Sequence, residues 1–168
     1  MATRDLQATF QHLVEEHRRI LYKVCNSYCR ERQSRDDLAQ EITIQLWRSF
    51  PAFDGRCRFS TWMYRIALNV AISFYRKEST RKRHVISGEP HLLEAAHETE
   101  SRPEEIRLLY QFIEGLDPLN KALLLLYLDD NSYREIAGVL GITETNVATK
   151  ISRLKNKMKH ELGPTSRT

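Results

Sequence analysis

The sequence has little of what stabilises secreted or membrane-bound proteins. Its 168 residues include only three cysteines, an odd number that argues against a disulfide framework and for a reducing compartment. No apolar run approaches the roughly 20 residues that a membrane-spanning helix needs. The first five residues, Met1 to Asp5, lack the apolar stretch of a secretory signal. We therefore expect a cytoplasmic protein.

Glycine and proline are also scarce, with six and five residues, and no segment shows the alternation typical of a strand. Apolar residues instead recur three or four positions apart, which predicts helices. The predicted fold class is all-α, with two small helical domains joined by a flexible linker. These are a three-helix N-terminal bundle over residues 1–79 and a four-helix domain over residues 104–163, with the linker over residues 80–103.

The pattern predicts one uninterrupted first helix from about Asp5 to Glu31 and a second from about Ser34 to Ser49. A third helix is expected to begin at Ser60 or Thr61 and to end near Lys77. Apolar stripes predict which sides are buried. These stripes are Leu38, Ile42 and Leu46 in the second helix, and Ile106, Leu109, Tyr110 and Ile113 in the first helix of the second domain.

Charge is distributed unevenly along the chain, although the total is only +4. Residues 51–88 contain eight basic and two acidic side chains, a net charge of +6, and residues 118–168 contain eight and five, a net charge of +3. Residues 89–117 between them contain two and eight, a net charge of −6. Two basic blocks separated by an acidic stretch favour two surfaces that bind a polyanion.

The most informative segment runs from Ser132 to Ile151, where two helical patterns meet at Gly141. Two short helices joined by a tight turn are typical of a helix-turn-helix. The outward side of its second helix carries short polar groups and cations, which suit base edges and phosphates in a major groove. The candidate DNA-binding residues are Arg134, Thr143, Glu144, Thr145, Asn146, Ala148, Thr149, Lys150, Arg153 and Lys155.

A second segment, from Phe59 to Lys77, interleaves aromatic residues with arginines. Such a helix is often part of a core, but aromatic rings beside cations can also stack unpaired bases while the cations hold the backbone. The loop before it, from Pro51 to Arg58, adds further candidates. The residues predicted to contact nucleic acid here are Phe53, Arg56, Arg58, Thr61, Trp62, Arg65, Asn69, Arg76 and Lys77.

A third segment, from Asp36 to Arg48, has a second helical face beside its buried stripe. An acidic and polar face with one exposed aliphatic residue suits a protein partner better than DNA. The residues of this predicted face are Asp37, Gln40, Glu41, Ile44 and Arg48.

In combination, and in their order along the chain, the three segments resemble bacterial RNA polymerase sigma factors of the sigma-70 family, specifically the extracytoplasmic-function (ECF) group. Asp37-Leu38-Ala39-Gln40-Glu41 through Trp47 is similar to the helix that docks on the polymerase clamp. Phe59-Ser60-Thr61-Trp62-Met63-Tyr64-Arg65-Ile66-Ala67-Leu68-Asn69 is similar to the helix that opens and reads the −10 element. Tyr133 to Arg153 is similar to the −35 helix-turn-helix.

The resemblance implies a specificity subunit rather than an enzyme, with no cofactor and no small-molecule substrate. Its implied partners are core RNA polymerase, through the beta-prime clamp and the beta flap, promoter DNA and an anti-sigma factor. Two positions depart from the family's pattern: Ala148 stands where a basic residue is frequent, and Lys150 where arginine is frequent. Because lysine lacks bidentate geometry, the usual −35 contacts do not transfer residue by residue.

Three alternatives remain open at this point. A helix-turn-helix regulator that acts without polymerase would explain residues 118–162 only, and an adaptor module would leave the two basic blocks unexplained. A metal site could recruit Cys25 and Cys29, one helical turn apart, with His17 and Cys57. We favour the interpretation that the two cysteines are small buried hydrophobic residues, so no metal is predicted.

Overall fold

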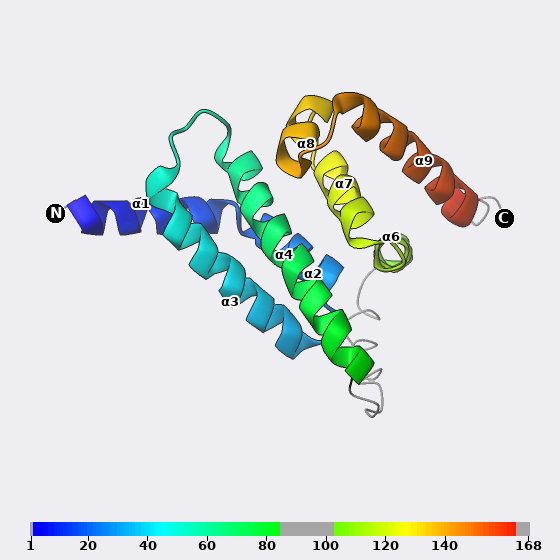
Figure 1. Ribbon diagram of the computed structural model, residues 1–168, viewed down its shortest axis with the longest axis horizontal. Coiled ribbons are helices and arrows are strands. Elements are labelled where there is room, and N and C mark those ends of the chain that lie inside the picture. The colour runs from blue at the N-terminus through cyan, green and yellow to red at the C-terminus, as the bar shows by residue number, and fades with distance from the viewer. Residues whose placement is uncertain (1, 85–102, 164–168) are drawn as a thin grey trace. The chain divides into compact units, whose positions relative to one another are not determined.

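The computed structural model describes residues 2–84 and 103–163, which form two compact units that divide near Thr80 (Figure 1). Both units are built from helices, and no strand occurs within these two ranges. The predicted all-α class is therefore confirmed. Most of the predicted linker, residues 85–102, lies outside the described residues.

The first unit contains α1 (Ala2–Glu16), α2 (Arg18–Tyr28), α3 (Arg32–Ser49), the short 3₁₀ helix η1 (Phe50–Ala52) and α4 (Phe59–His84). The prediction of one uninterrupted first helix is wrong, because the chain turns at His17, where φ is −107° and ψ is 19°. The Nδ1 atom of His17 lies 2.9 Å from the carbonyl oxygen of Leu13, and its ring packs on Phe59 with the centroids 5.1 Å apart. These contacts hold the corner between α1 and α2.

The core of the first unit lies where α2, α3 and α4 pack together. The predicted stripe of Leu38, Ile42 and Leu46 is completely buried. Met63 and Ala67 of α4 are also completely buried. Burial of a large aliphatic side chain stabilises the fold by about 1.5–3 kcal/mol, so this stripe fixes which side of α3 remains outside.

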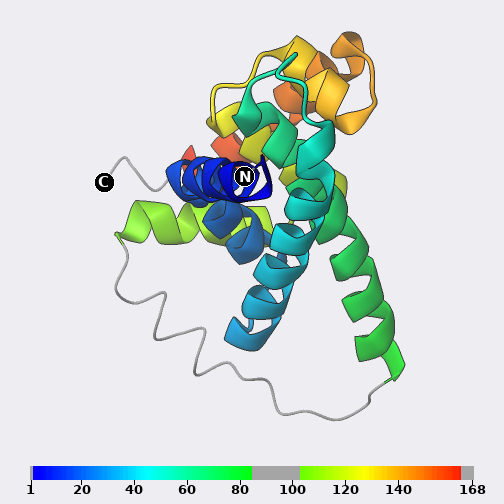
Figure 2. The same cartoon turned by 90° about the vertical axis from the view of Figure 1, so that its left-hand side faces the viewer.

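Helix α4 is longer than the sequence pattern predicts. It begins at Phe59 and continues to His84, seven residues beyond the expected end at Lys77. The segment from Glu78 to His84 is polar, and apolar periodicity therefore gave no signal for these two additional turns. Figure 2 shows α4 in full, with the connection from α3 entering it as an open loop.

The second unit contains α6 (Glu104–Glu114), α7 (Pro118–Leu128), α8 (Tyr133–Leu140) and α9 (Glu144–Leu162). These are four helices in the order predicted for this part of the chain. The residues Leu123 to Leu126 of α7 are all buried and form its centre. Ile106, expected on a buried stripe, is instead 42% exposed, because α6 packs through Phe112 and Ile113 at its other end.

Two polar caps determine where α8 and α9 begin. The amide of Glu135 donates to Ser132 Oγ (3.1 Å), and the amide of Ser132 donates to the Glu135 carboxylate (2.8 Å), which is a complete capping box. Thr143 Oγ1 accepts from the amide of Asn146 (3.1 Å) at the start of α9. Each such cap stabilises its helix by about 1 kcal/mol.

No described helix is both long and apolar enough to cross a bilayer.

Candidate functional site

The predicted protein-binding face of α3 lies on the outside of the first unit. All five of its residues are exposed: Asp37, Gln40, Glu41, Ile44 and Arg48. They lie opposite the buried stripe of the same helix, so the packing of α3 holds them in a fixed register. We call these five residues the α3 ridge.

Trp47 extends the α3 ridge and was not among its predicted residues. It is 37% exposed beside Ile44, which is 42% exposed, while its ring contacts Phe10 of α1 with the centroids 5.1 Å apart. The two apolar side chains follow one another at i and i+3 on the helix. That spacing was visible in the sequence and would have identified Trp47.

A cluster of aromatic rings lies beneath the loop that joins α3 to α4. Phe50 is 7% exposed, and its ring centroid lies 5.2 Å from that of Phe10, 6.2 Å from Trp62 and 6.4 Å from both Phe53 and Phe59. Aromatic pairs at such distances add about 0.5–1.5 kcal/mol each beyond their buried area. Phe53 and Trp62, both predicted to contact nucleic acid, are half-buried members of this cluster.

The loop above the cluster presents cationic side chains to solvent. Gly55 has a φ of +75°, and the side chain of Asp54 accepts from the amide of Arg56 at 3.1 Å and pairs with its guanidinium at 3.1 Å. Arg56, Cys57 and Arg58 are exposed. The turn at Asp54 and Gly55 therefore positions two arginines next to the start of α4.

Helix α4 has one exposed polar side. Arg65, Asn69, Arg76 and Lys77 are all exposed there, as predicted. Thr61 differs from the prediction: it is only 7% exposed, and its Oγ1 has no hydrogen-bond partner among the described residues. Its expected position on the exposed side is wrong, because Thr61 lies on the side of α4 that also buries Tyr64 and Leu68.

The helix-turn-helix has the predicted turn at Gly141, which adopts a left-handed conformation with φ of 68° and ψ of 34°. Ile136, Val147, Ile151 and Leu154 are buried where α8 and α9 pack against the rest of the unit. The outward side is exposed at Arg134, Thr143, Glu144, Thr145, Asn146, Thr149, Arg153 and Lys155, and half-buried at Ala148 and Lys150.

The ammonium of Lys155, one of the predicted contacts, has a partner within the second unit. Its Nζ lies 4.7 Å from the centroid of the Tyr127 ring, in a cation–π contact that joins α9 to α7. A hydrogen bond with the Tyr127 side chain also raises the pKa of Lys155 above its ordinary value. Lys157 lies over Phe112 in the same way, at 5.9 Å.

The cysteine and histidine side chains that the structure describes do not come together in one site. Cys25 and Cys29 are buried, whereas Cys57 is exposed on the loop. Burial, followed by the neighbouring Cys29 thiol, raises the pKa of Cys25 to about 12. Within residues 2–84 and 103–163, no group of three or more histidine, cysteine or acidic side chains is arranged to hold a metal ion.

Together these features describe an all-helical, DNA-binding transcription factor with a helix-turn-helix in its second unit. Family models agree with both units: Sigma-70 region 2 matches residues 13–81, and Sigma-70 region 4 matches residues 106–158. The chain belongs to the sigma-70 family of RNA polymerase sigma factors, and its relatives place it in the ECF group.

Two relatives match almost the whole chain. The ECF RNA polymerase sigma factor SigX of Bacillus subtilis (strain 168) is 26% identical over 164 residues, which cover 92% of this chain and 84% of SigX. The ECF RNA polymerase sigma-E factor of Escherichia coli (strain K12) is 29% identical over 172 residues, which cover 94% of this chain and 88% of the relative.

Solved structures show the same fold. CnrH, in complex with the cytosolic domain of CnrY, has a TM-score of 0.66 at 24% identity, covering 94% of this chain and 89% of CnrH. The sigma factor RpoE from Bartonella quintana, in complex with the anti-sigma factor NepR, has a TM-score of 0.67 at 15% identity, covering 96% of this chain and 98% of that one.

Proposed function

We propose that this sigma factor binds core RNA polymerase through the α3 ridge and directs it to promoters through two DNA-binding surfaces, one on each unit. The observation that carries this proposal is the arrangement of the first unit. Its acidic and apolar α3 ridge and its cationic loop and α4 side are all exposed, on helices that share one core. Such a unit can bind a protein and a nucleic acid at the same time.

The α3 ridge suits a basic helical surface such as the beta-prime clamp. Ile44 and Trp47 supply an apolar centre, and Asp37 and Glu41 flank it with negative charge. Interfaces of this kind place apolar and aromatic residues centrally and charged residues at the rim. The rim charges then guide the encounter and fix its register.

The loop and the outward side of α4 suit the −10 element at the point where the duplex opens. Arg56 and Arg58, together with Arg65, Arg76 and Lys77, hold phosphates, and the exposed edges of Phe53 and Trp62 offer a surface on which an unpaired base stacks. Stacking of a base on an aromatic side chain contributes about 1–3 kcal/mol, which offsets the few kcal/mol that extrusion of a base costs.

The second unit suits the −35 element. The polar residues at the start of α9, among them Thr145 and Thr149, enter the major groove, and Arg153 contacts a base or a phosphate beside them. Lys150 acts as a point charge toward the backbone rather than as a bidentate reader. Contacts of the second unit with the beta flap, and regulation by an anti-sigma factor that covers these surfaces, complete the proposed set of partners in the cytoplasm.

Run-off transcription with purified core polymerase tests this function. Addition of the chain is expected to make initiation promoter-specific, whereas a chain that binds isolated duplex DNA at nanomolar concentration but does not direct core polymerase would be a regulator of another kind. The transcribed DNA fragments identify the promoter for the experiments below.

Charge reversal tests the role of the α3 ridge. Glu41→Lys is expected to weaken binding to core polymerase at least tenfold, since loss of a charge-assisted contact costs about 1.5–3 kcal/mol. Glu16→Lys is the matched control, because it makes the same charge change at an exposed position of α1. Equal binding of the two variants in a competition assay against the unmodified chain would contradict the assignment.

A further inference from the structure

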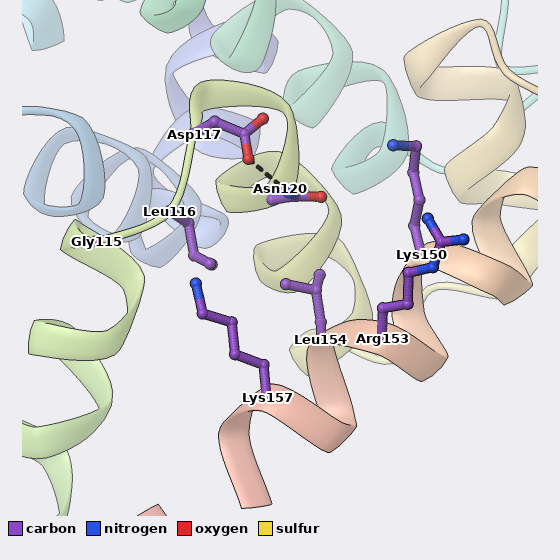
Figure 3. A pocket seen from close by; sticks show the side chains of 8 residues that line it. All are labelled: Gly115, Leu116, Asp117, Asn120, Lys150, Arg153, Leu154 and Lys157. Atoms are coloured by element: carbon purple, nitrogen blue, oxygen red, sulfur yellow. Dashed lines mark hydrogen bonds between the residues drawn. The ribbon is translucent and has the colours of Figure 1, made fainter. Parts of the chain in front are cut away.

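The second unit contains a pocket that the residues predicted to read DNA do not explain. It has a volume of about 210 Å³ and lies between the turn from α6 to α7 and one side of α9. Figure 3 shows its lining: Gly115, Leu116, Asp117 and Asn120 come from the turn and the start of α7, and Lys150, Arg153, Leu154 and Lys157 come from α9.

The charge of this lining favours an anion. Three of the eight residues are cations, at positions 150, 153 and 157, which share one side of α9 because they are spaced by three and four residues. Asp117 is the one carboxylate among the eight. Cations concentrated in a concave site reinforce one another's field more than the same charges on a flat surface do.

The lining is held in place before any ligand binds. Leu154, in the middle of α9, is buried. The Asn120 side chain donates to Asp117 across the start of α7 (Figure 3), so the amide and the carboxylate fix one another's orientation. The Lys157 ammonium lies over the Phe112 ring, 5.9 Å from its centroid, in a contact that limits the motion of the side chain, and Figure 3 shows the ammonium pointing toward Leu116. A pre-ordered site binds a small ligand with less loss of side-chain entropy.

We propose that this pocket binds a single phosphate group and that the backbone of promoter DNA supplies it. The proposal rests on the proposed function and extends the DNA-binding surface from the outward side of α9 to Lys157 and the turn at Gly115 to Asn120. Arg153 and Lys150 belong to both surfaces, so a strand whose bases meet α9 passes the mouth of the pocket. The pocket then fixes the register of the helix-turn-helix on the duplex without reading sequence.

The test compares Lys157→Gln with Lys159→Gln in the complete holoenzyme. Lys159 is an exposed cation of the same helix and does not line the pocket, so both variants lose one positive charge. Affinity for the promoter fragment is measured over a range of salt concentrations. Loss of one phosphate contact reduces the slope of log affinity against log salt by about 0.9. The affinity lost between 50 and 200 mM salt therefore becomes about 3.5-fold smaller for Lys157→Gln than for Lys159→Gln.

Asp117→Asn is expected to change DNA affinity in the opposite direction from Lys157→Gln. It keeps the shape of the lining, because asparagine has the size of aspartate and its side-chain oxygen still accepts from Asn120. The Asp117 carboxylate and a bound phosphate are both negative and repel one another. Removal of the carboxylate charge is therefore expected to tighten DNA binding about fourfold, which corresponds to the interaction of two unit charges about 5 Å apart in water. This variant keeps the proposal testable if Lys157→Gln fails to fold.

Titration of the free chain with inorganic phosphate, followed by the amide NMR signals of Gly115 and Asn120, separates the two sources of phosphate. Saturable shifts that Lys157→Gln abolishes support a phosphate site. If the salt slopes of the two lysine variants are nevertheless equal, DNA is not the source. Equal slopes without any phosphate-induced shift overturn the proposal, whereas a chain that fails to direct transcription overturns the proposed function instead.

Discussion

The substitution Gly141→Ala, which adds a single methyl group, tests the turn of the helix-turn-helix most directly. Gly141 ends α8 with a φ of 68°, and a Cβ added there meets no atom within 4 Å. The cost of Gly141→Ala is therefore purely conformational. A residue with a Cβ pays about 1–2 kcal/mol in the left-handed region, and reduced entropy of the unfolded chain returns about 0.4–1 kcal/mol. We expect a net loss of about 1 kcal/mol.

Gly138 supplies the matched control three residues earlier. It lies inside α8 with helical geometry, and a Cβ there also meets no atom within 4 Å. Gly138→Ala is expected to stabilise the unit by about 0.5–1 kcal/mol, because alanine is the better helix former. The same chemical change thus has opposite signs at two neighbouring positions.

Thermal unfolding measures both effects in the full chain. The only two tryptophans, Trp47 and Trp62, lie in the first unit, so a helical transition by circular dichroism without a change in tryptophan fluorescence reports the second unit. For a unit of about 60 residues, 1 kcal/mol shifts the Tm by about 4–8 °C. A rise in Tm for Gly141→Ala, or shifts of the same sign for both variants, would refute the reasoning.

Three further predictions concern the aromatic cluster, the lysine on Tyr127 and the cysteines. Phe50→Ala is expected to lower the free energy of unfolding of the first unit by about 3–5 kcal/mol, measured by tryptophan fluorescence in urea; a loss below 1 kcal/mol would contradict the central position of Phe50. Tyr127→Phe is expected to keep the ring beneath Lys155 but to return the lysine pKa toward its ordinary value, as NMR titration of the ammonium would show; an unchanged pKa would exclude the hydroxyl as the cause. At pH 8, an alkylating reagent is expected to modify Cys57 but not Cys25, as detected by mass spectrometry, since only Cys57 is exposed. Because the pKa of the Cys25 thiol is raised from 9.0 to about 12, its contribution to stability is complete below pH 9 and is lost as the pH rises toward 12.

Much of the fold follows from features that local sequence carries. The buried stripe of Leu38, Ile42 and Leu46 follows from helical spacing alone. The bounds of α8 and α9 follow from the caps at Ser132 and Thr143 and from the glycine at 141. These features involve residues within one or two helical turns of one another. They can therefore be recognised in a single sequence without any knowledge of the partner helices.

The errors arise where contacts between distant residues decide the outcome. The corner at His17 depends on Phe59, which lies 42 positions later in the chain. The burial of Thr61 and the exposure of Ile106 depend on how α4 and α6 pack, which helical periodicity does not specify. Lys155 has the appearance of a DNA contact in the sequence, and only the structure reveals Tyr127 beneath it.

For the candidate site, the sequence predicted every member of the exposed α3 ridge and most of the cationic residues near α4. It did not include Trp47, although the spacing of Trp47 from Ile44 is visible in the sequence. It also did not predict the pocket lined by Lys157, because the other wall of that pocket is the turn from α6 to α7. The roles of these residues in binding polymerase and DNA remain predictions for the experiments above.

The ring cluster around Phe50 has a consequence for engineering. Phe53 begins the loop and Phe59 follows its end, and both rings pack against Phe50. Phe10, which lies 40 positions before Phe50 in the chain, packs against it from α1. A loop transplanted here from another sigma factor would therefore lack the aromatic side chains that support it. An exchange of this loop between such proteins should therefore require that the aromatic residues of α1, η1 and α4 are transferred together with it.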